Sequence, residues 1–592
     1  MSAVLAAGIF AMVHGAQAAP VHAEVVKAAN GWQMLRGGQP FFIKGAGGDG
    51  SLEILKAAGA NSVRTWGADN LEPLLDKAQS LGMTVTVGIW LGQERQGFNY
   101  SDAGQVARQL ESVREAVKRY KDHPAVLMWG LGNEMEGYAK GDNAAIWSSI
   151  NNVAEMVKKL DPNHPTMTVI AEIGGDRVTN IHRLCPDIDV IGINSYGGTA
   201  SIAERYNQAG GTKPYVITEF GPPGAWESEK TPWGAPLEPS STEKGEWYRR
   251  AYAGSIDRKP LCLGSYAFVW GFKQEATATW YGMFLPDGSK VQAVDTMTEL
   301  WSGKPSAAKC PAIKSLKLEG ENQVEPGAEF KVSLDASDPG GKPFKVRWVL
   351  QPEQTRTGTG GDSEPDLPVL IQAILRSDER HAEVRAPQDA GGYRLFAYLD
   401  NGVGAAVANT PFNVKGTPKA PTGKLASMPF VIFADQQPGG THYFPSGWMG
   451  NTKAIKMDEA SRVRPHDGAT CLRFEYQAGN DWAGVVWQDP ANDWGDEAGG
   501  WNLSGAKRLV FWARGEKGGE TVVFKFGLIG RDKKYPDSAF GSLEGVKLAT
   551  EWKQFSIDLT GKDLSCVKTA FAWTAAGQGT PLIFYLDDIA YE

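Results

Sequence analysis

Two glutamates follow dense apolar runs, and this placement favours chemistry by a pair of carboxylates. Residues 125–131 are apolar and strand-forming, and the next polar groups are Asn133 and Glu134. A second run, PYVITEFG at 214–221, reaches Glu219. A retaining glycosidase needs one carboxylic acid to protonate the leaving oxygen and one carboxylate to attack the sugar carbon. We therefore assign Glu134 as the acid/base and Glu219 as the nucleophile.

The sequence around these glutamates predicts alternating strands and helices, which must position them. Dense apolar runs suit parallel strands buried on both faces, and the carboxyl ends of barrel strands carry catalytic groups. Ser101 or Asp102 can cap the helix that precedes the first run. The pattern predicts a (β/α)8 TIM barrel over residues 25–305, with strands at 41–45, 61–66, 84–90, 125–131, 165–171, 188–194, 216–219 and 263–270, and helices at 51–58, 70–81, 102–120, 144–160 and up to 301.

The motifs WGLGNE and VITEFG resemble the strand-four and strand-seven motifs of clan A glycoside hydrolases, particularly families 2, 5 and 72. Four other positions match the clan's order: Arg64 in NSVRTWG, Asn133, Tyr196 in GINSYGG and Trp270 in YAFVWG. The resemblance implies that Arg64 and Tyr196 keep the nucleophile ionised and oriented. It also implies that Asn133 binds the sugar 2-hydroxyl and that Trp270 forms the floor of the sugar site. No cofactor is expected for catalysis.

Aromatic residues in two rim loops are predicted to form sugar subsites. The loop at 221–241 is rich in Pro and Gly and carries Trp226 and Trp233, and the loop after strand eight carries Trp280. Loops at this face of a barrel usually decide specificity. Glu172, at the end of strand five, is a third rim carboxylate, to which we assign a structural or substrate-binding role.

Two β domains are predicted after the barrel. Beyond a linker at 303–311, residues 312–415 alternate with a period of two, which indicates an immunoglobulin-like β-sandwich that acts as a spacer and has an exposed loop at 358–366. After a second linker at 415–425, residues 428–592 predict a Trp-rich jelly-roll. This jelly-roll resembles carbohydrate-binding modules of the galactose-binding-like type, and the alternative is a purely structural domain. The resemblance implies Asp435 and Asp588 as ligands of a structural calcium ion.

Composition narrows the partners and the compartment. The net charge is −8, with 68 acidic and 60 basic residues and no basic block, which argues against a nucleic-acid partner. Residues 1–18 have the apolar core and the small-residue end of a signal peptide, although no Lys or Arg precedes the core, so we expect a secreted or periplasmic protein. No later stretch is typical of a membrane span. The five cysteines show no metal-ligand spacing, and we interpret them as structural or inert.

These observations predict a retaining β-glycoside hydrolase that acts on a polysaccharide or oligosaccharide by double displacement. A β-glucan is the preferred substrate by family analogy, while the motifs leave open the sugar, the linkage and endo or exo action. Two alternatives stay open. With a sugar acceptor in place of water, the same residues would make a transglycosylase, and without turnover the chain would be a glycan-binding surface protein.

Overall fold

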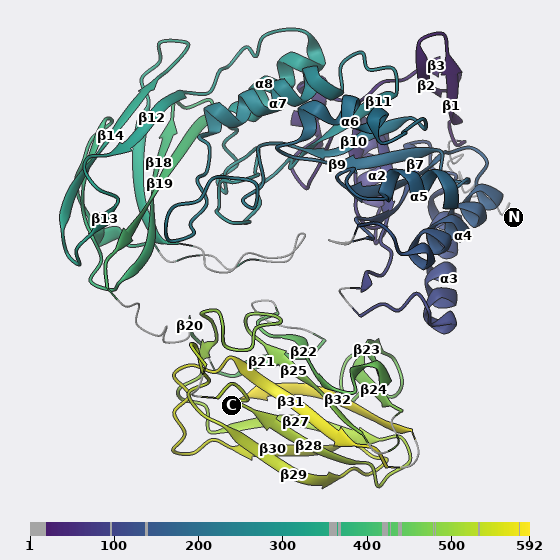
Figure 1. Ribbon diagram of the computed structural model, residues 1–592, viewed down its shortest axis with the longest axis vertical. Helices are drawn as coiled ribbons and strands as arrows, with labels where there is room; N and C mark the ends of the chain where they lie inside the picture. Colours follow the sequence, from purple (N-terminus) through teal and green to yellow (C-terminus); the bar gives the residue numbers. More distant parts are fainter. Residues whose placement is uncertain are drawn as a thin grey trace, which may run out of the picture. The chain divides into compact units, whose positions relative to one another are not determined.

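The computed structural model describes residues 19–592 apart from 95–96, 137–139, 354–363, 365–366, 368, 417–423, 427, 436–440, 478, 480, 531–532 and 579–580. The predicted signal peptide at 1–18 and most of the predicted loop at 358–366 lie outside the described residues. The chain forms two compact units. The first contains a barrel and a β-sandwich, and the second is the C-terminal domain (Figure 1).

A closed barrel of parallel strands forms the first part of the chain, which confirms the predicted (β/α)8 fold. Its neighbouring strands follow the order β10-β11-β4-β5-β6-β7-β8-β9. Because all eight strands run in the same direction, their carboxyl ends meet at one rim. The strands are β4 (Ile43–Gly47), β5 (Ser62–Arg64), β6 (Thr84–Ile89), β7 (Val126–Asn133), β8 (Thr166–Ala171), β9 (Val190–Asn194), β10 (Tyr215–Phe220) and β11 (Cys262–Phe268).

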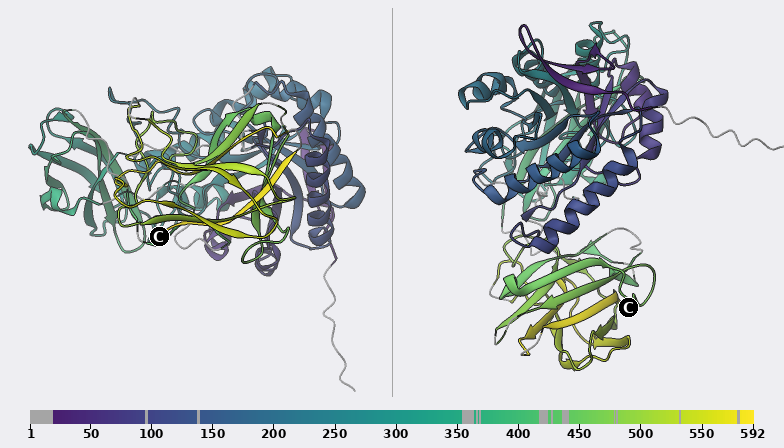
Figure 2. Two further views of the ribbon diagram at one scale, coloured as in Figure 1. Left: turned by 90° about the horizontal axis from the view of Figure 1, so that it is seen from below. Right: turned by 90° about the vertical axis from the view of Figure 1, so that its right-hand side faces the viewer.

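Helices cover the outside of the barrel (Figure 2). They are α1 (Leu52–Ala57), α2 (Glu72–Ser80), α3 (Ala103–Tyr120), α4 (Ala144–Leu160), α5 (Arg177–Leu184), η2 (Thr199–Ser201), α6 (Ile202–Gln208), α7 (Ser241–Ser255) and α8 (Gln292–Ser302). Asp102 is the N-cap of α3, and it is one of the two residues, Ser101 and Asp102, that the sequence offered for this role. The sequence did not reveal α5 and α6, which are short, or α7, which contains Gly245 and Gly254. Among the described residues, no helix is long and apolar enough to cross a membrane.

A small antiparallel sheet closes the amino-terminal end of the barrel, and the strand and helix pattern did not predict it. It consists of β1 (Ala23–Ala28), β2 (Gly31–Arg36) and β3 (Gln39–Pro40). Ala23 and Met34 of this sheet are buried in one cluster with inward-facing barrel residues such as Leu127. Trp32 N–H donates to Pro260 O over 2.8 Å and ties the sheet to the loop before β11. Packing therefore fills this end, and the catalytic candidates lie at the other.

The β-sandwich after the barrel has two four-stranded sheets, ordered β12-β14-β17-β16 and β13-β19-β18-β15, which confirms the predicted sandwich. Residues such as Val332, Leu350 and Val384 fill the space between the sheets. Phe396 and Val407 instead join the core of the barrel, so the sandwich packs tightly on it. The elements are β12 (Ala312–Leu318), β13 (Gln323–Val324), β14 (Glu329–Ser337), β15 (Lys345–Pro352), η3 (Ile371–Ala373), β16 (Ile374–Ser377), β17 (His381–Arg385), β18 (Gly391–Asp400) and β19 (Ala405–Val414).

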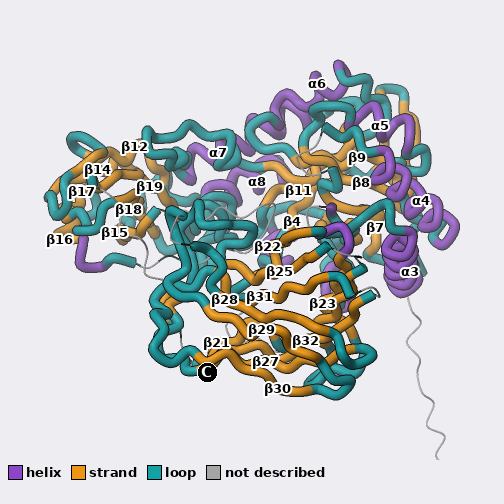
Figure 3. The backbone as a smooth tube through the Cα atoms, turned by 60° about the horizontal axis from the view of Figure 1, so that its bottom comes forward, coloured by secondary structure: helices purple, strands orange, loops and turns teal. Residues whose placement is uncertain are grey.

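The C-terminal domain is a second sandwich, in agreement with the predicted jelly-roll (Figure 3). Its sheets follow the orders β23-β24-β32-β27-β30, with β21 beside β32, and β22-β25-β31-β28-β29. Trp487 and Trp573 are core residues, whereas Trp482 is 51% exposed. Cys185, Cys262, Cys310 and Cys471 are buried free thiols. The elements are β20 (Lys424–Leu425), β21 (Phe430–Phe433), β22 (Phe444–Gly450), η4 (Thr452–Ala454), β23 (Ile455–Ser461), β24 (Cys471–Tyr476), β25 (Trp482–Gln488), β26 (Trp501–Asn502), β27 (Arg508–Gly515), β28 (Thr521–Phe526), β29 (Gly541–Lys547), β30 (Lys553–Asp558), β31 (Thr569–Ala576) and β32 (Leu582–Tyr591).

Candidate active site

Glu219 lies near the carboxyl end of β10 and is held by three hydrogen-bond donors. Arg64 Nη1 donates to Oε1 over 2.9 Å, and Trp66 Nε1 donates to the same oxygen over 2.7 Å. Tyr196 OH donates to Oε2 over 2.7 Å. The side chains of Arg64 and Glu219 are 3% and 8% exposed, so the ion pair is nearly dry. Because both oxygens accept hydrogen bonds, the direction of the carboxylate is fixed.

Glu134 follows β7 directly and is in a different environment. Its backbone has a φ of +51°, a conformation that is rare outside glycine, and its N–H donates to Val169 O over 2.9 Å. Asn194 Nδ2 donates to Oε1 over 2.7 Å. Burial, and then the negative charge of Glu219, raise the pKa of Glu134 to about 7. This carboxyl can therefore hold a proton at a pH at which an ordinary glutamate has lost it.

A hydrogen-bonded bridge of amides and a guanidinium joins the two glutamates. Arg64, which binds Glu219 with Nη1, also donates from Nη2 to Asn133 Oδ1 over 2.7 Å. Asn194 Nδ2 donates to the same oxygen over 3.2 Å as well as to Glu134. The structure thus brings together five of the predicted site residues: Arg64, Asn133, Glu134, Tyr196 and Glu219.

Aromatic rings surround the nucleophile. The ring of Phe268 lies 5.9 Å from Trp66 and 5.8 Å from Tyr196 between centroids, and Tyr281 lies 5.4 Å from Tyr196. Trp226, in the loop after β10, meets Tyr196 edge-on at 5.8 Å and is 62% exposed. Flat apolar rings beside a charged group are suited to the faces of a sugar ring. Trp226 is therefore placed to extend the site outward.

Three predicted subsite residues lie elsewhere. Trp270 is 1% exposed, donates from Nε1 to Ser51 O over 3.0 Å, and packs on Phe284 and Trp301. Trp280 is fully buried and donates to Pro223 O over 2.9 Å. Neither ring has a surface for a sugar, so their predicted roles are wrong. Trp233 lies beside Gly392 of the sandwich, 3.6 Å from the position of an added Cβ.

Sequence reasoning missed Trp66, Asn194 and Phe268, although each lies within a motif that it used. Trp66 and Asn194 are two residues from Arg64 and Tyr196, and side chains two apart on a strand point to the same side. This spacing was the available signal. Phe268 is the last residue of β11, and its ring lies beside those of Trp66 and Tyr196.

The third rim carboxylate, Glu172, forms an ion pair. Arg205 Nη1 and Nη2 lie 2.7 and 3.2 Å from its two oxygens, and Ser195 Oγ also donates to it. The paired side chains are about one third exposed, at 37% and 34%. This arrangement fits the predicted structural or substrate-binding role.

Both residues of the predicted calcium site, Asp435 and Asp588, contact other protein groups. Asp435 accepts hydrogen bonds from the backbone of Ala469 and from Thr470. Asp588 Oδ2 lies 2.7 Å from His466 Nδ1. Within the described part of the chain, no group of three or more His, Cys, Asp or Glu is arranged to hold a metal ion. Calcium binding therefore stays a prediction.

Fold and site together define the class of the protein. A parallel barrel that places two glutamates in contrasting environments at one rim is the arrangement of a glycoside hydrolase. Residues 49–225 match the family described as glycosyl hydrolases family 2, TIM barrel domain. This part of the barrel is therefore similar to the TIM barrel domain of that family.

Several curated proteins are similar to part of the chain. A beta-glucuronidase of Sus scrofa is 30% identical over 224 residues, which are 32% of this chain and 32% of that protein. A beta-glucuronidase of Paenibacillus borealis is 26% identical over 287 residues, or 42% and 45% of the two chains. The chain thus spans less than half the length of these two relatives.

Solved structures give weaker likenesses. A beta-D-glucuronidase from Dictyoglomus thermophilum matches with a TM-score of 0.38 and 22% identity, over 48% of this chain and 54% of that chain. An endo-beta-1,4-mannanase from Thermotoga petrophila matches with a TM-score of 0.33 and 12% identity, over 64% and 98%. Both scores are below 0.5, and no conclusion about function follows from them.

Proposed function

We propose that this protein is a retaining β-glycoside hydrolase that acts on a neutral polysaccharide, preferably a β-glucan. The observation that carries the proposal is the contrast between the two rim glutamates. Glu219 has three donors, one of which is the cation of Arg64, whereas the pKa of Glu134 is raised to about 7. A nucleophile must be charged and an acid must hold a proton, and these two environments meet those two needs.

The reaction proceeds in two displacements. Glu134 donates its proton to the glycosidic oxygen while Glu219 attacks the anomeric carbon, so the C–O bond to the leaving group breaks and a glycosyl ester forms. Glu134, now a carboxylate, takes a proton from water, and the oxygen of that water displaces Glu219. Asn133 Oδ1 is engaged by Arg64, which orients the amide NH2 as the donor for the sugar 2-hydroxyl. Retention requires carboxyl groups about 5 to 5.5 Å apart.

Charge pairing at the rim supports a neutral sugar. The names of the curated relatives suggest a glucuronide as the rival substrate, and a uronate would need a cation that is not already neutralised. Arg64 pairs with Glu219, and Arg205 pairs with Glu172. Lys273, whose Nζ lies 5.1 Å from the Phe268 ring centroid, pairs with Glu275 over 2.8 Å. Each of these three described cations is thus already opposed by a carboxylate.

The proposed place of action is outside the cytoplasm, either secreted or periplasmic. The apolar segment within residues 1–18 supports export. Two further features suit a polymeric substrate, which an enzyme would meet outside the cytoplasm. These features are the exposed ring of Trp226 beside the site and a C-terminal domain that resembles carbohydrate-binding modules. A structural calcium ion in that domain is part of the same proposal.

Proton NMR of products over time tests the proposal. Wild type and Glu219→Ala are incubated with β-glucans, mannans, xylans, galactans and an aryl β-glucuronide. Early appearance of the β-anomer from a β-glucan, absent with Glu219→Ala, is the expected result. Early α-anomer would exclude retention, and turnover of the glucuronide alone would exclude the neutral substrate. Chains longer than the substrate would identify a transglycosylase, and binding without turnover would identify a glycan-binding protein.

A further inference from the structure

Two loops of the barrel rim are fastened to the β-sandwich as well as to each other. The first follows β10 and contains Pro223 and Pro236, and the second follows β11 and contains residues 271–291. Trp280 Nε1 donates to Pro223 O over 2.9 Å and joins the loops. Arg394 of β18 donates from Nη2 to Pro236 O over 2.7 Å and joins the first loop to the sandwich. The rim is therefore held from a separate domain.

The centre of this junction is Glu238, a buried carboxylate with donors from three parts of the chain. Its partners are Lys244 Nζ at 2.5 Å on α7, and Thr277 Oγ1 and Thr279 Oγ1, both at 2.7 Å, in the second loop. The fourth is Asn409 Nδ2 of β19, at 2.7 Å. Burial acts to raise the pKa of Glu238, but the charges of Lys244 and Arg394, together with hydrogen bonds from Lys244 and Thr277, lower it below its ordinary value.

On the sandwich side of the junction, Arg394 is also buried and also forms several hydrogen bonds. Arg394 is 1% exposed and pairs with Glu353, with a shortest distance of 2.6 Å. Its Nη1 donates to Asn409 Oδ1 over 2.6 Å. Asn409 thus uses its oxygen toward Arg394 and its nitrogen toward Glu238. One amide joins the ion pair of the sandwich to the ion pair of the barrel.

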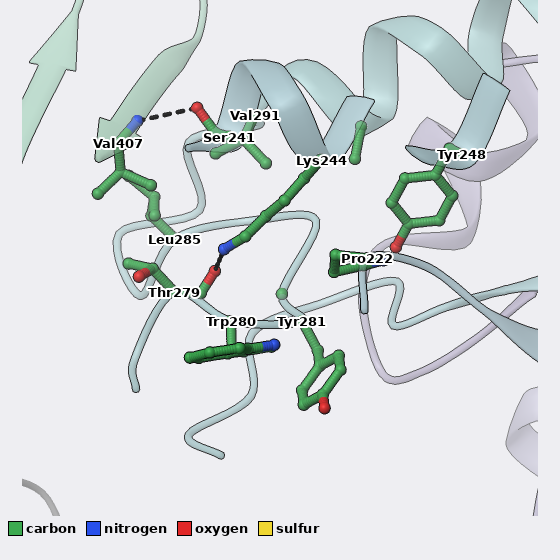
Figure 4. A pocket seen from close by; sticks show the side chains of 12 residues that line it. Pro222, Ser241, Lys244, Tyr248, Thr279, Trp280, Tyr281, Leu285, Val291 and Val407 are labelled. Carbon is green, nitrogen blue, oxygen red and sulfur yellow. Dashed lines mark hydrogen bonds between the residues drawn. The ribbon is translucent and has the colours of Figure 1, made fainter. Parts of the chain in front are cut away.

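The junction continues to the nucleophile through the second loop. Lys244 Nζ also donates to Thr279 O over 2.6 Å, directly before Trp280 and Tyr281 (Figure 4). The ring of Tyr281 then lies 5.4 Å from that of Tyr196, which donates to Glu219. Every contact in this series is buried or half-buried, and close packing transmits small displacements.

We infer that Asn409 is a positioning residue for the reaction, which acts through Glu238 and the loop of Trp280 and Tyr281 on the orientation of Tyr196 toward Glu219. The sandwich is then a working part of the catalytic unit, in place of the spacer expected from the sequence. This inference rests on the proposed function. A misplacement of about 1 Å at a reacting group can lower a rate by as much as 100-fold, so small shifts of the loop matter.

The test compares Asn409→Ala with Val384→Ala in the full chain. Val384 is fully buried in the sandwich core and touches none of the junction, so its truncation destabilises the same domain by a different route. Thermal unfolding and kinetics on an aryl β-glucoside are measured for both variants and wild type. Asn409→Ala is expected to lower kcat by roughly 10-fold or more with KM within twofold of wild type. Val384→Ala is expected to keep kcat within twofold at a similar loss of Tm.

Two results would overturn the inference. One is a kcat of Asn409→Ala within twofold of wild type, which would leave the sandwich a spacer. The other is an equal loss of kcat in both variants at equal loss of Tm, which would show a general effect of stability. A wild-type chain without turnover on any β-glycoside refutes the proposed function, and this inference with it. That outcome can be distinguished from the other two because it is observed in the wild-type protein, without any variant.

Discussion

Protonation of Glu134 should set the alkaline limit of activity. Its pKa is raised to about 7 from an ordinary value of 4.5, first by burial and then by the charge of Glu219. The acid form therefore falls from about 90% at pH 6 to about 50% at pH 7 and about 10% at pH 8. Because the first displacement needs that proton, kcat/KM should decline about tenfold per pH unit well above pH 7.

Two substitutions should move this pKa in opposite directions. Glu219→Gln removes the neighbouring charge and keeps the shape, so the pKa of Glu134 should decrease. Burial is the larger cause of the shift and remains in this variant, so the pKa should stay above the ordinary value of 4.5. Asn194→Ala removes the hydrogen bond that favours the charged carboxylate, so the pKa should increase.

A carbon-13 NMR titration of protein labelled at the glutamate carboxyl carbon measures these values without turnover. Glu134→Gln identifies the signal by its disappearance. A Glu134 carboxyl that titrates near 4.5 in wild type would refute the assigned proton donor. An unchanged value in Glu219→Gln would refute the electrostatic contact between the two glutamates, and with it the shared site.

Stability, specificity and polymer binding should each respond to one substitution. Glu134→Gln should raise Tm at pH 8 but not at pH 4, because a carboxyl with a raised pKa costs stability as pH rises from 4.5 through about 7, by at most about 3 kcal/mol. Glu275→Gln removes the partner of Lys273, so kcat/KM for an aryl β-glucuronide relative to the β-glucoside should rise roughly tenfold. Trp226→Ala should raise KM for the polysaccharide roughly fivefold and leave kcat on an aryl glycoside within twofold.

The stability prediction has a control variant within the chain, and each of the three predictions has a result that would contradict it. Glu172→Gln loses the ion pair with Arg205, so it should not share the pH-dependent gain of the acid/base variant. A gain of equal size at pH 4 and pH 8 would contradict a raised pKa. An unchanged substrate ratio in Glu275→Gln would show that Lys273 does not face the sugar. Equal KM values with and without the ring of Trp226 would remove it from the substrate path.

That Glu134 and Glu219 lie close to Arg64, Asn133 and Tyr196 could be predicted because the signals are local. A strand that ends in a carboxylate is visible in a few residues, and parallel strands in a barrel bring such ends together. Arg64 and Tyr196 then follow from the order of the strands. The role predicted for Trp270 was wrong because the strand was expected to run to residue 270, whereas it ends at Phe268, and the alternation of side chains does not continue beyond the end of a strand. The observed end at Phe268 moves Trp270 into the core.

The junction between the barrel and the sandwich could not be predicted. Glu238 and Asn409 are 171 positions apart, and neither lies in a pattern that suggests a partner. Their meeting depends on how two complete domains pack, which periodicity within one element cannot encode. The aromatic residues of the rim show the same dependence. Trp226 and Trp280 occur in similar polar loops, yet one is 62% exposed and the other is fully buried.

Three rim glutamates illustrate how structure assigns roles that sequence leaves equal. Glu134, Glu172 and Glu219 each follow or end an apolar strand, so position alone would permit any of them to react. Glu172 already holds Arg205 in an ion pair that is about one third exposed. Glu219 is nearly buried, and its donors bind both oxygens, which fixes the orientation that the proposed nucleophile needs. Glu134 has one close amide donor and a raised pKa, so the proton resides there. The number and charge of the donors around each carboxylate, more than the apolar run before it, decide which one attacks and which one protonates.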